Sequence, residues 1–160
     1  MVEARQRAYD AVAAVTDPEI PVLTIADLGV LRDVTLTGER VEVTITPTYS
    51  GCPAMHVIGL EIDLALARAG FADRAIRIVL SPAWTTDWLT EVGRDKLAAY
   101  GIAPPARAGG RRALFGETAI ACPRCHSADT ERLAEFGSTA CKSLYRCRAC
   151  REPFDAFKCH

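Results

Sequence analysis

The stretch TPTYSGCP, residues 46–53, joins two segments with different hydrophobic periods. Before it, over residues 41–45, apolar and polar side chains alternate as in a β-strand with one buried face. After it, over residues 55–69, apolar residues recur at helical spacing. We therefore predict a tight strand-to-helix turn at Cys52, with Pro53 in the first helical turn, where its missing N–H costs no hydrogen bond.

Two more strands are predicted around this turn. Residues 34–37 alternate in the same way, and Gly38-Glu39 offers a turn into the strand at 41–45, so the two strands form a β-hairpin with one solvated face. Residues 76–80 alternate again after the helix. Because a helix connects them to the second strand of the hairpin, we expect the two strands to be parallel and joined by a right-handed crossover.

Two further helices complete the predicted domain. Apolar residues at helical spacing predict a helix over residues 4–15, which Asp17-Pro18 ends. A second helix is predicted to be capped by Thr86 or Asp87 and to end at Gly101. The order αββαβα predicts an α+β fold, a small sandwich of three strands covered by helices.

Residues 17–29, DPEIPVLTIADLG, interrupt this pattern with two prolines and no sustained period. We predict an ordered loop, and loops of this kind tend to line functional sites. Its carboxylates, on Asp17, Glu19 and Asp27, could act as acid and base. The favoured interpretation is that they accept hydrogen bonds from backbone N–H groups of their own loop.

Cys122-Pro-Arg-Cys125 and Cys147-Arg-Ala-Cys150 form two Cys-x2-Cys knuckles, a spacing typical of zinc ribbons. Both sulfurs of a knuckle can reach one ion, and two knuckles complete the tetrahedral shell that zinc prefers. Since four protein ligands leave no open position, we predict a structural zinc site around a hairpin centred on Gly137-Ser138. An iron centre of the rubredoxin type is the alternative, which a colourless, iron-free protein would exclude.

Composition predicts the domain limits and excludes several classes of function. We expect an α/β domain over residues 1–103, a Pro-, Gly- and Arg-rich linker over 104–116 and a zinc ribbon over 117–160. A net charge of −1 gives no field that steers the chain to nucleic acid or to anionic membranes. The N-terminus lacks the apolar core of a signal peptide, and charges interrupt every long apolar run, so we expect a cytoplasmic protein.

Cys52 is the candidate functional thiol. At a helix start it faces unpaired N–H groups and the positive end of the helix dipole, and we expect both to stabilise the thiolate. His56, four residues on, could ligate the same metal, although a structural hydrogen bond is the favoured role for a single histidine there. A Cys/His hydrolase is disfavoured because nothing marks an oxyanion hole, and no phosphate-binding glycine loop occurs.

The remaining cysteines and histidines leave two interpretations open. In the simpler one, Cys141 is a small buried apolar side chain and Cys159-His160 is a frayed terminus. In the other, these residues together with His126 form a transient metal or cluster site.

Several motifs carry a family resemblance. DPEIP (17–21), DLGV (27–30), TPTYSGCP (46–53) and SPAWTTDWLT (81–90) resemble the MIP18 (DUF59) family of iron–sulfur assembly factors. Joined to CPRCHS (122–127), FGSTACKSLYRC (136–147) and CREPFDAFKCH (150–160), they resemble the PaaD family of bacterial phenylacetate catabolism.

The resemblance implies an accessory role for the phenylacetyl-CoA ring-1,2-epoxidase, a multicomponent oxygenase. Its reductase holds a flavin and a [2Fe–2S] cluster and its hydroxylase a di-iron centre, so both are clients for a maturation factor. Within the family, the residue matching Cys52 is associated with cluster work and the one matching Glu19 lies nearby. We assign Cys52, Glu19, Asp17 and His56 to iron or cluster handling.

We expect a maturation factor that is not catalytic alone. It would carry structural Zn²⁺ and a transient iron or Fe–S cluster, and it would contact the epoxidase components and the iron–sulfur assembly machinery. A homodimer is left open. The alternative is a constitutive oxygenase subunit that takes part in electron transfer.

Overall fold

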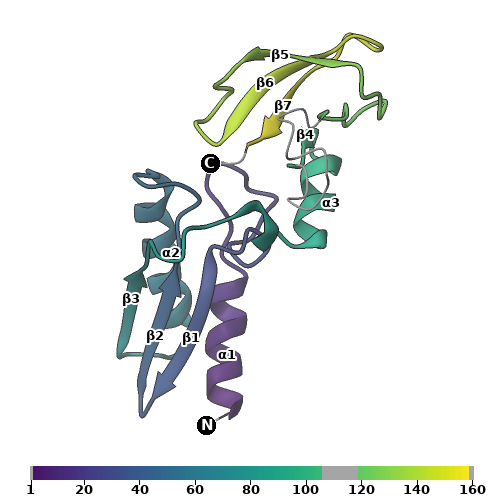
Figure 1. The fold of residues 1–160 in the computed structure, drawn as a ribbon. Coiled ribbons are helices and arrows are strands. Elements are labelled where there is room, and N and C mark those ends of the chain that lie inside the picture. Colours follow the sequence, from purple (N-terminus) through teal and green to yellow (C-terminus); the bar gives the residue numbers. More distant parts are fainter. Residues whose placement is uncertain (1, 106–118, 159–160) are drawn as a thin grey trace. The chain divides into compact units, whose positions relative to one another are not determined.

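The computed structural model describes residues 2–105 and 119–158 (Figure 1). The chain divides into two compact units, residues 1–84 and residues 85–160. The division falls earlier than the limits at 103 and 117 that composition predicts, and most of the predicted linker lies outside the described residues. Each unit is built on a sheet of its own.

The first unit has the predicted order of elements. Helix α1 (Val2–Ala13) precedes the hairpin of β1 (Leu31–Thr37) and β2 (Arg40–Ile45), which is followed by α2 (Ala54–Arg68) and β3 (Arg74–Ile78). The sheet order is β1-β2-β3. Strand β1 pairs antiparallel with β2, and β2 pairs parallel with β3, which confirms the predicted hairpin and crossover.

The core of this unit lies between the sheet and its two helices. Helices α1 and α2 contact each other, and they also contact the edge strands β1 and β3 respectively. The alternation in β2 explains this arrangement, since Val41, Val43 and Ile45 are fully buried on one face. From α2 the core receives the buried residues Met55, Ile58, Ile62 and Leu66.

The loop between α1 and β1 is ordered and contributes to the same core. Ile20, Leu23, Ile25 and Leu28 are buried in it although no helical or strand period predicts this. Backbone hydrogen bonds fold the loop back on itself, from Asp17 N–H to Leu23 O at 2.9 Å and from Ile25 N–H to Val15 O at 2.9 Å. The loop therefore presents its acidic side chains from a fixed backbone.

The second unit is built on a four-stranded sheet of order β4-β7-β6-β5. Its elements are the 3-10 turn η1 (Thr86–Trp88), α3 (Glu91–Ala99), β4 (Ile102–Ala103), β5 (Thr130–Ala134), β6 (Lys142–Cys147) and β7 (Pro153–Phe157). Strands β5 and β6 form the predicted hairpin around Gly137-Ser138. Strands β4 and β7 were not predicted, and they pair parallel with each other.

The predicted start of the helix in this unit is wrong. Neither Thr86 nor Asp87 caps it. They lie in η1, and Thr90 is the N-cap of α3, its Oγ1 accepting a hydrogen bond from Gly93 N–H at 3.0 Å. The break is held by the buried Arg94, whose guanidinium donates to Thr86 O at 2.9 Å and to Pro105 O at 2.6 Å. Within the described part of the chain, no helix is both long and apolar enough to cross a membrane.

Candidate functional site

The stretch from Thr46 to Pro53 connects β2 to α2 through a tight turn, as predicted. Gly51 has φ of 81°, a conformation that glycine adopts without steric cost. Cys52 N–H donates to Tyr49 O at 3.3 Å, and Cys52 O accepts from Met55 N–H at 3.3 Å in the first turn of α2. The thiol is therefore held at the junction of the strand and the helix.

The pKa of the Cys52 thiol is raised, which is opposite to the direction expected for a helix start. Partial burial is the largest cause, because it penalises the charged thiolate. The Ala54 N–H and the Tyr49 hydroxyl both hydrogen-bond to the sulfur and lower the pKa, as the helix-start argument requires. The negative charges of Glu19 and Asp17 raise it again. At neutral pH Cys52 is a protonated thiol.

The acidic loop supplies these two charges. Oδ1 of Asp17 accepts hydrogen bonds from the N–H groups of Glu19 and Ile20, both at 2.8 Å. Asp27 accepts from Thr24 N–H at 3.0 Å, and its own N–H donates to Thr24 Oγ1 at 3.0 Å. The backbone-capping interpretation is thus confirmed for Asp17 and Asp27. Glu19 is half-buried and acts on the thiol through its charge.

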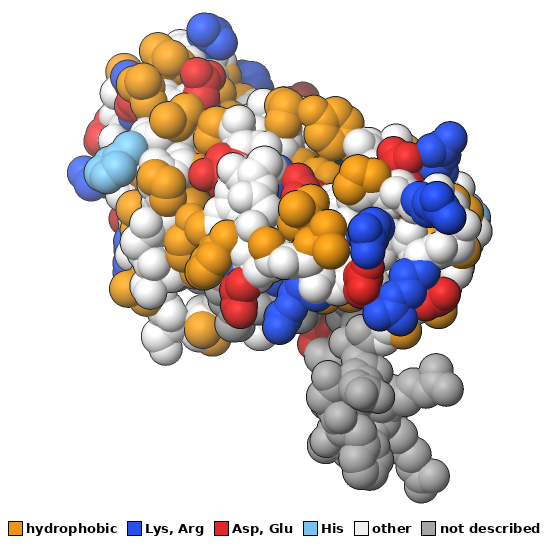
Figure 2. All heavy atoms as spheres, turned by 90° about the horizontal axis from the view of Figure 1, so that it is seen from above, with side chains coloured by type: hydrophobic (Ala, Val, Ile, Leu, Met, Phe, Trp, Pro, Cys, Tyr) orange, Lys and Arg blue, Asp and Glu red, His pale blue; other side chains and the backbone are white. Residues whose placement is uncertain are grey.

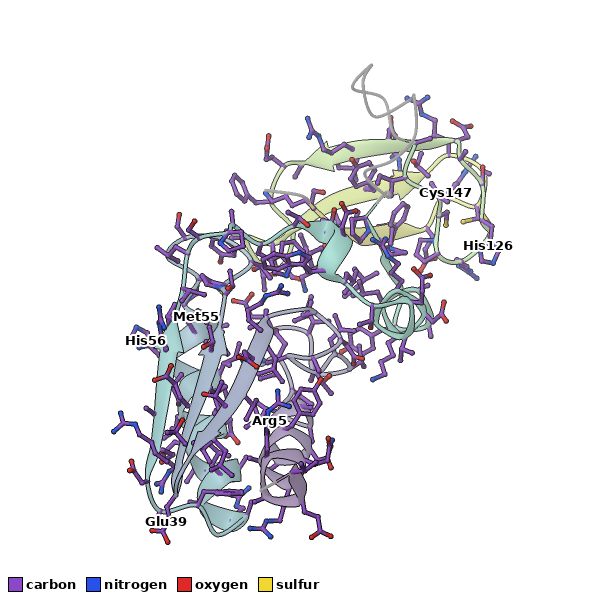
Figure 3. The ribbon with its side chains drawn as sticks, turned by 60° about the horizontal axis from the view of Figure 1, so that its bottom comes forward. Arg5, Glu39, Met55, His56, His126 and Cys147 are labelled. Atoms are coloured by element: carbon purple, nitrogen blue, oxygen red, sulfur yellow. The ribbon has the colours of Figure 1, made fainter. Side chains whose placement is uncertain are left out.

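His56 lies on the exposed side of α2, whereas its neighbour Met55 is buried (Figure 3). Its charge is not among the influences on the Cys52 thiol. Among residues 2–105 and 119–158, Cys52 belongs to no group of three or more closely spaced metal ligands. The structure thus brings the charges of Asp17 and Glu19 to the Cys52 thiol.

One polar group in this region was not predicted. The Thr46 side chain is 1% exposed, and its Oγ1 has no hydrogen-bond partner in the described structure. Its backbone N–H donates to Val30 O at 2.9 Å. Nothing in the alternation of β2 indicates a buried hydroxyl here, because burial at this position depends on segments distant in sequence.

The two knuckles of the second unit converge. The sulfurs of Cys122, Cys125, Cys147 and Cys150 all lie within 4.8 Å of one another. Cys122 and Cys150 are 3.7 Å apart at Sγ, and Cys125 and Cys147 are 3.5 Å apart. Four sulfurs at this spacing can surround one ion tetrahedrally, so the donor set fits zinc.

Local hydrogen bonds prepare this cluster for a metal. The Cys150 N–H donates to the Cys147 sulfur at 3.5 Å and, with the neighbouring thiols, lowers the pKa of Cys147 to about 7. For Cys150, the Glu152 N–H lowers the pKa, but burial and the three neighbouring sulfurs outweigh it and raise it to about 12. One sulfur therefore ionises before its neighbour, as expected when thiols share protons.

The other candidates of this unit that the structure describes are not members of the four-cysteine cluster. Cys141 is 5% exposed, as the simpler interpretation requires, and its sulfur lies 3.0 Å from Thr139 Oγ1. His126 is at the exposed tip of the first knuckle, at φ of 62°, and is not one of the four ligands (Figure 3). Cys159 and His160 lie outside the described residues.

Comparisons with known families match both parts of the chain. Residues 5–76 match the family described as iron–sulfur cluster assembly protein, and residues 106–158 match the PaaD zinc beta ribbon domain. The first match contains Cys52 and the acidic loop, and the second contains both knuckles.

Two relatives extend these matches. A protein of Escherichia coli (strain K12), provisionally named as a subunit of 1,2-phenylacetyl-CoA epoxidase, is 54% identical over 91% of this chain and 87% of its own length. The Fe-S protein maturation auxiliary factor YitW of Bacillus subtilis (strain 168) is 33% identical over 60% of this chain and 87% of its own length.

Solved structures give the same fold for the first part. A DUF59 domain from Bacillus anthracis has a TM-score of 0.56 at 24% identity, over 60% of this chain and 92% of that domain. A conserved hypothetical protein from Thermotoga maritima has a TM-score of 0.50 at 22% identity, over 58% and 92%. At these identities the likeness concerns the fold alone.

Proposed function

This chain belongs to the PaaD family, which joins an iron–sulfur cluster assembly domain to a zinc β-ribbon, and we propose that it is a maturation factor for a phenylacetyl-CoA epoxidase. Its proposed task is to assist iron or iron–sulfur cluster assembly in the reductase and oxygenase components. The name of the 54% identical relative supports the link to the epoxidase, and the name of the more distant relative supports the maturation role.

The observation that carries the proposal is the pairing of a protonated, half-buried thiol in the turn between β2 and α2 with two carboxylates of the loop between α1 and β1. Burial and the charges of Glu19 and Asp17 keep the Cys52 proton in place when no cation is present. Since the thiolate is the form that binds metals and is oxidised, a protonated thiol is a poor ligand and a slow target of oxidants. The resting thiol is therefore protected from oxidation.

An arriving iron cation reverses this balance. The negative charges that oppose a thiolate attract a cation, so binding of iron between Cys52 and Glu19 would release the thiol proton. The Ala54 N–H and the Tyr49 hydroxyl already bond to the sulfur and would stabilise its charged form. Iron is here a cargo. A site with so few ligands from this chain leaves coordination positions for donor and client.

In this proposal the ribbon docks the client and its zinc is structural. Four cysteine ligands leave no open position for chemistry at that metal. Zinc would stabilise a small sheet whose buried apolar cluster is limited, with Ala103, Cys122, Cys147, Phe154 and Ala156 at its centre.

The test is co-expression of the epoxidase components with the Cys52→Ala protein, followed by measurement of the [2Fe–2S] content of the purified reductase. Ser50→Ala is the matched control, because Ser50 is exposed in the same turn. We expect low cluster content with Cys52→Ala and normal content with Ser50→Ala. Full content and activity with Cys52→Ala would reject the proposed role.

A constitutive subunit is the second candidate, and the name of the 54% identical relative favours it. It predicts that the protein co-purifies with the epoxidase in fixed ratio and that turnover falls when it is omitted from already matured components. Unchanged turnover on omission would exclude this candidate and leave the maturation role.

A further inference from the structure

Strand β3 is an open edge of the first sheet. Among the described strands it pairs with β2 alone. Its odd-numbered residues face β2, since Val79 N–H donates to Ile45 O and Asp73 O accepts from Val41 N–H, both at 2.9 Å. In a parallel ladder the N–H and C=O groups of the alternate residues 74, 76 and 78 then point away from β2. Such an edge is a template for another strand.

The opposite edge of the sheet, strand β1, is partly covered by the chain itself. The Arg5 side chain of α1 donates from Nε to Val34 O of β1 at 2.8 Å, so part of that edge is occupied from within the chain (Figure 3). Strand β3 is flanked by large apolar side chains instead. Leu60 of α2 is 60% exposed, Ile78 is 53% exposed and Leu80 is 61% exposed.

The topology of the crossover places these three side chains toward the same end of the β3 edge. The Arg74 guanidinium contacts Asp63 of α2 at 2.6 Å, and Leu60 lies one helical turn before Asp63 on the same side. Because α2 runs antiparallel to β3 in this crossover, Leu60 lies toward the end of β3 that holds Ile78 and Leu80. On the face that Figure 2 presents, exposed hydrophobic side chains are interspersed with charged ones. We call Leu60, Ile78, Leu80 and the outward backbone of β3 the β3 edge surface.

The charges at this edge are balanced inside the chain. Arg74 forms a two-pronged ion pair with Asp63, at 2.6 and 2.9 Å, and Arg77 lies 3.9 Å from Glu42. An acidic partner therefore gains little at this edge. The strand accordingly suits a partner of its own composition, with apolar side chains and a free strand edge.

We propose that the β3 edge surface binds a second copy of this chain, with the two β3 strands pairing antiparallel about a two-fold axis at Ile78. This register places Ile78 opposite Ile78 of the second copy and Ile76 opposite its Leu80, so that outward N–H and C=O groups meet. Arg77 then faces Val79. A register centred on Arg77 would place two guanidinium groups opposite each other, which is unfavourable. The pairing produces one continuous sheet and does not depend on the proposed maturation role.

The test is the mass of the zinc-loaded full chain in solution by sedimentation equilibrium. We expect the mass of two chains for the unaltered protein, the mass of one chain for Ile78→Lys, and the mass of two chains for Val92→Lys. Val92 is the matched control, since it is 57% exposed on α3 in the other unit. Lysine at an edge strand interferes with pairing and leaves the β2 ladder intact.

A cross-linking experiment identifies the surface. In a Cys52→Ser background, Ile78→Cys is expected to form a symmetric intermolecular disulfide on mild oxidation, and Val92→Cys is not. A single-chain mass at every concentration would overturn the proposal. A dimer that survives Ile78→Lys, or the absence of the Ile78→Cys cross-link, would also overturn it. Protection of β3 from hydrogen exchange that arises only when an epoxidase component is added would assign the edge to another protein. This result would also overturn the proposal.

Discussion

The backbone N–H of Glu19 donates a hydrogen bond to Oδ1 of Asp17 at 2.8 Å, and this short turn fixes two carboxylates within electrostatic reach of the Cys52 thiol. Asp17 is buried and satisfies backbone donors, whereas Glu19 is the more accessible of the two. The two carboxylates of this turn therefore differ in role. Asp17 shapes the loop, and in our proposal Glu19 is the carboxylate that meets the cation.

Replacing Asp17 by alanine is expected to destabilise the protein by about 2 kcal/mol, because the buried N–H of Ile20 and the partly buried N–H of Glu19 lose their acceptor. Urea unfolding of the full chain measures this. Asp17→Asn keeps an acceptor oxygen and should lose less than half as much. Equal stability of the alanine variant and the unaltered protein would show that the turn does not need its side chain.

The reactivity of Cys52 toward iodoacetamide should be low at neutral pH and rise as the pH exceeds its raised pKa, because only the thiolate is alkylated. Peptide mapping of the zinc-loaded protein reports this thiol separately. Glu19→Gln removes a negative charge and should lower the pKa, whereas Tyr49→Phe removes a hydrogen bond to the sulfur and should raise it. Shifts in the same direction would contradict the geometry.

Zinc content should distinguish the cysteines of the second unit. Cys147→Ser removes a ligand and is expected to abolish stoichiometric zinc and the protection of the β5–β6 hairpin from hydrogen exchange. Cys141→Ser alters a buried sulfur outside the cluster and should retain zinc. Loss of zinc in both variants would assign Cys141 to the metal site.

Thr90→Ala should cost about 1 kcal/mol of stability, because the Gly93 N–H loses its side-chain acceptor at the start of α3. Thr85→Ala is the matched control, since Thr85 precedes η1 without a side-chain cap. Denaturant unfolding compares the two. A larger loss from Thr85→Ala would contradict the assigned cap.

Sequence alone predicted the elements whose signals are local. The alternation around Val43, the helical period after Pro53 and the spacing of the cysteine knuckles each depend on a few neighbouring residues, and each prediction was confirmed. The start of α3 was predicted too early, because hydrophobic periodicity does not reveal the break between η1 and α3. The hydrogen bonds from Arg94 to the carbonyls of Thr86 and Pro105 that accompany this break depend on the folded chain.

Features that depend on packing between distant segments could not be predicted from local sequence patterns. Strand β7 begins at Pro153 and is defined by its pairing with β6 and with β4, which lies some fifty residues earlier. The thiol of Cys52 was expected to have a lowered pKa from its helix-start position. Its burial and the charges from the acidic loop reverse that direction, and both come from packing of segments distant in sequence.

The central claim is that Cys52 handles iron or a cluster for a client protein. Its most direct test is the iron and sulfide content of the epoxidase reductase produced with the Cys52→Ala chain, with the Ser50→Ala chain as the control. We predict a reductase depleted of its [2Fe–2S] cluster with the first and fully loaded with the second. A fully loaded reductase with both would contradict the claim.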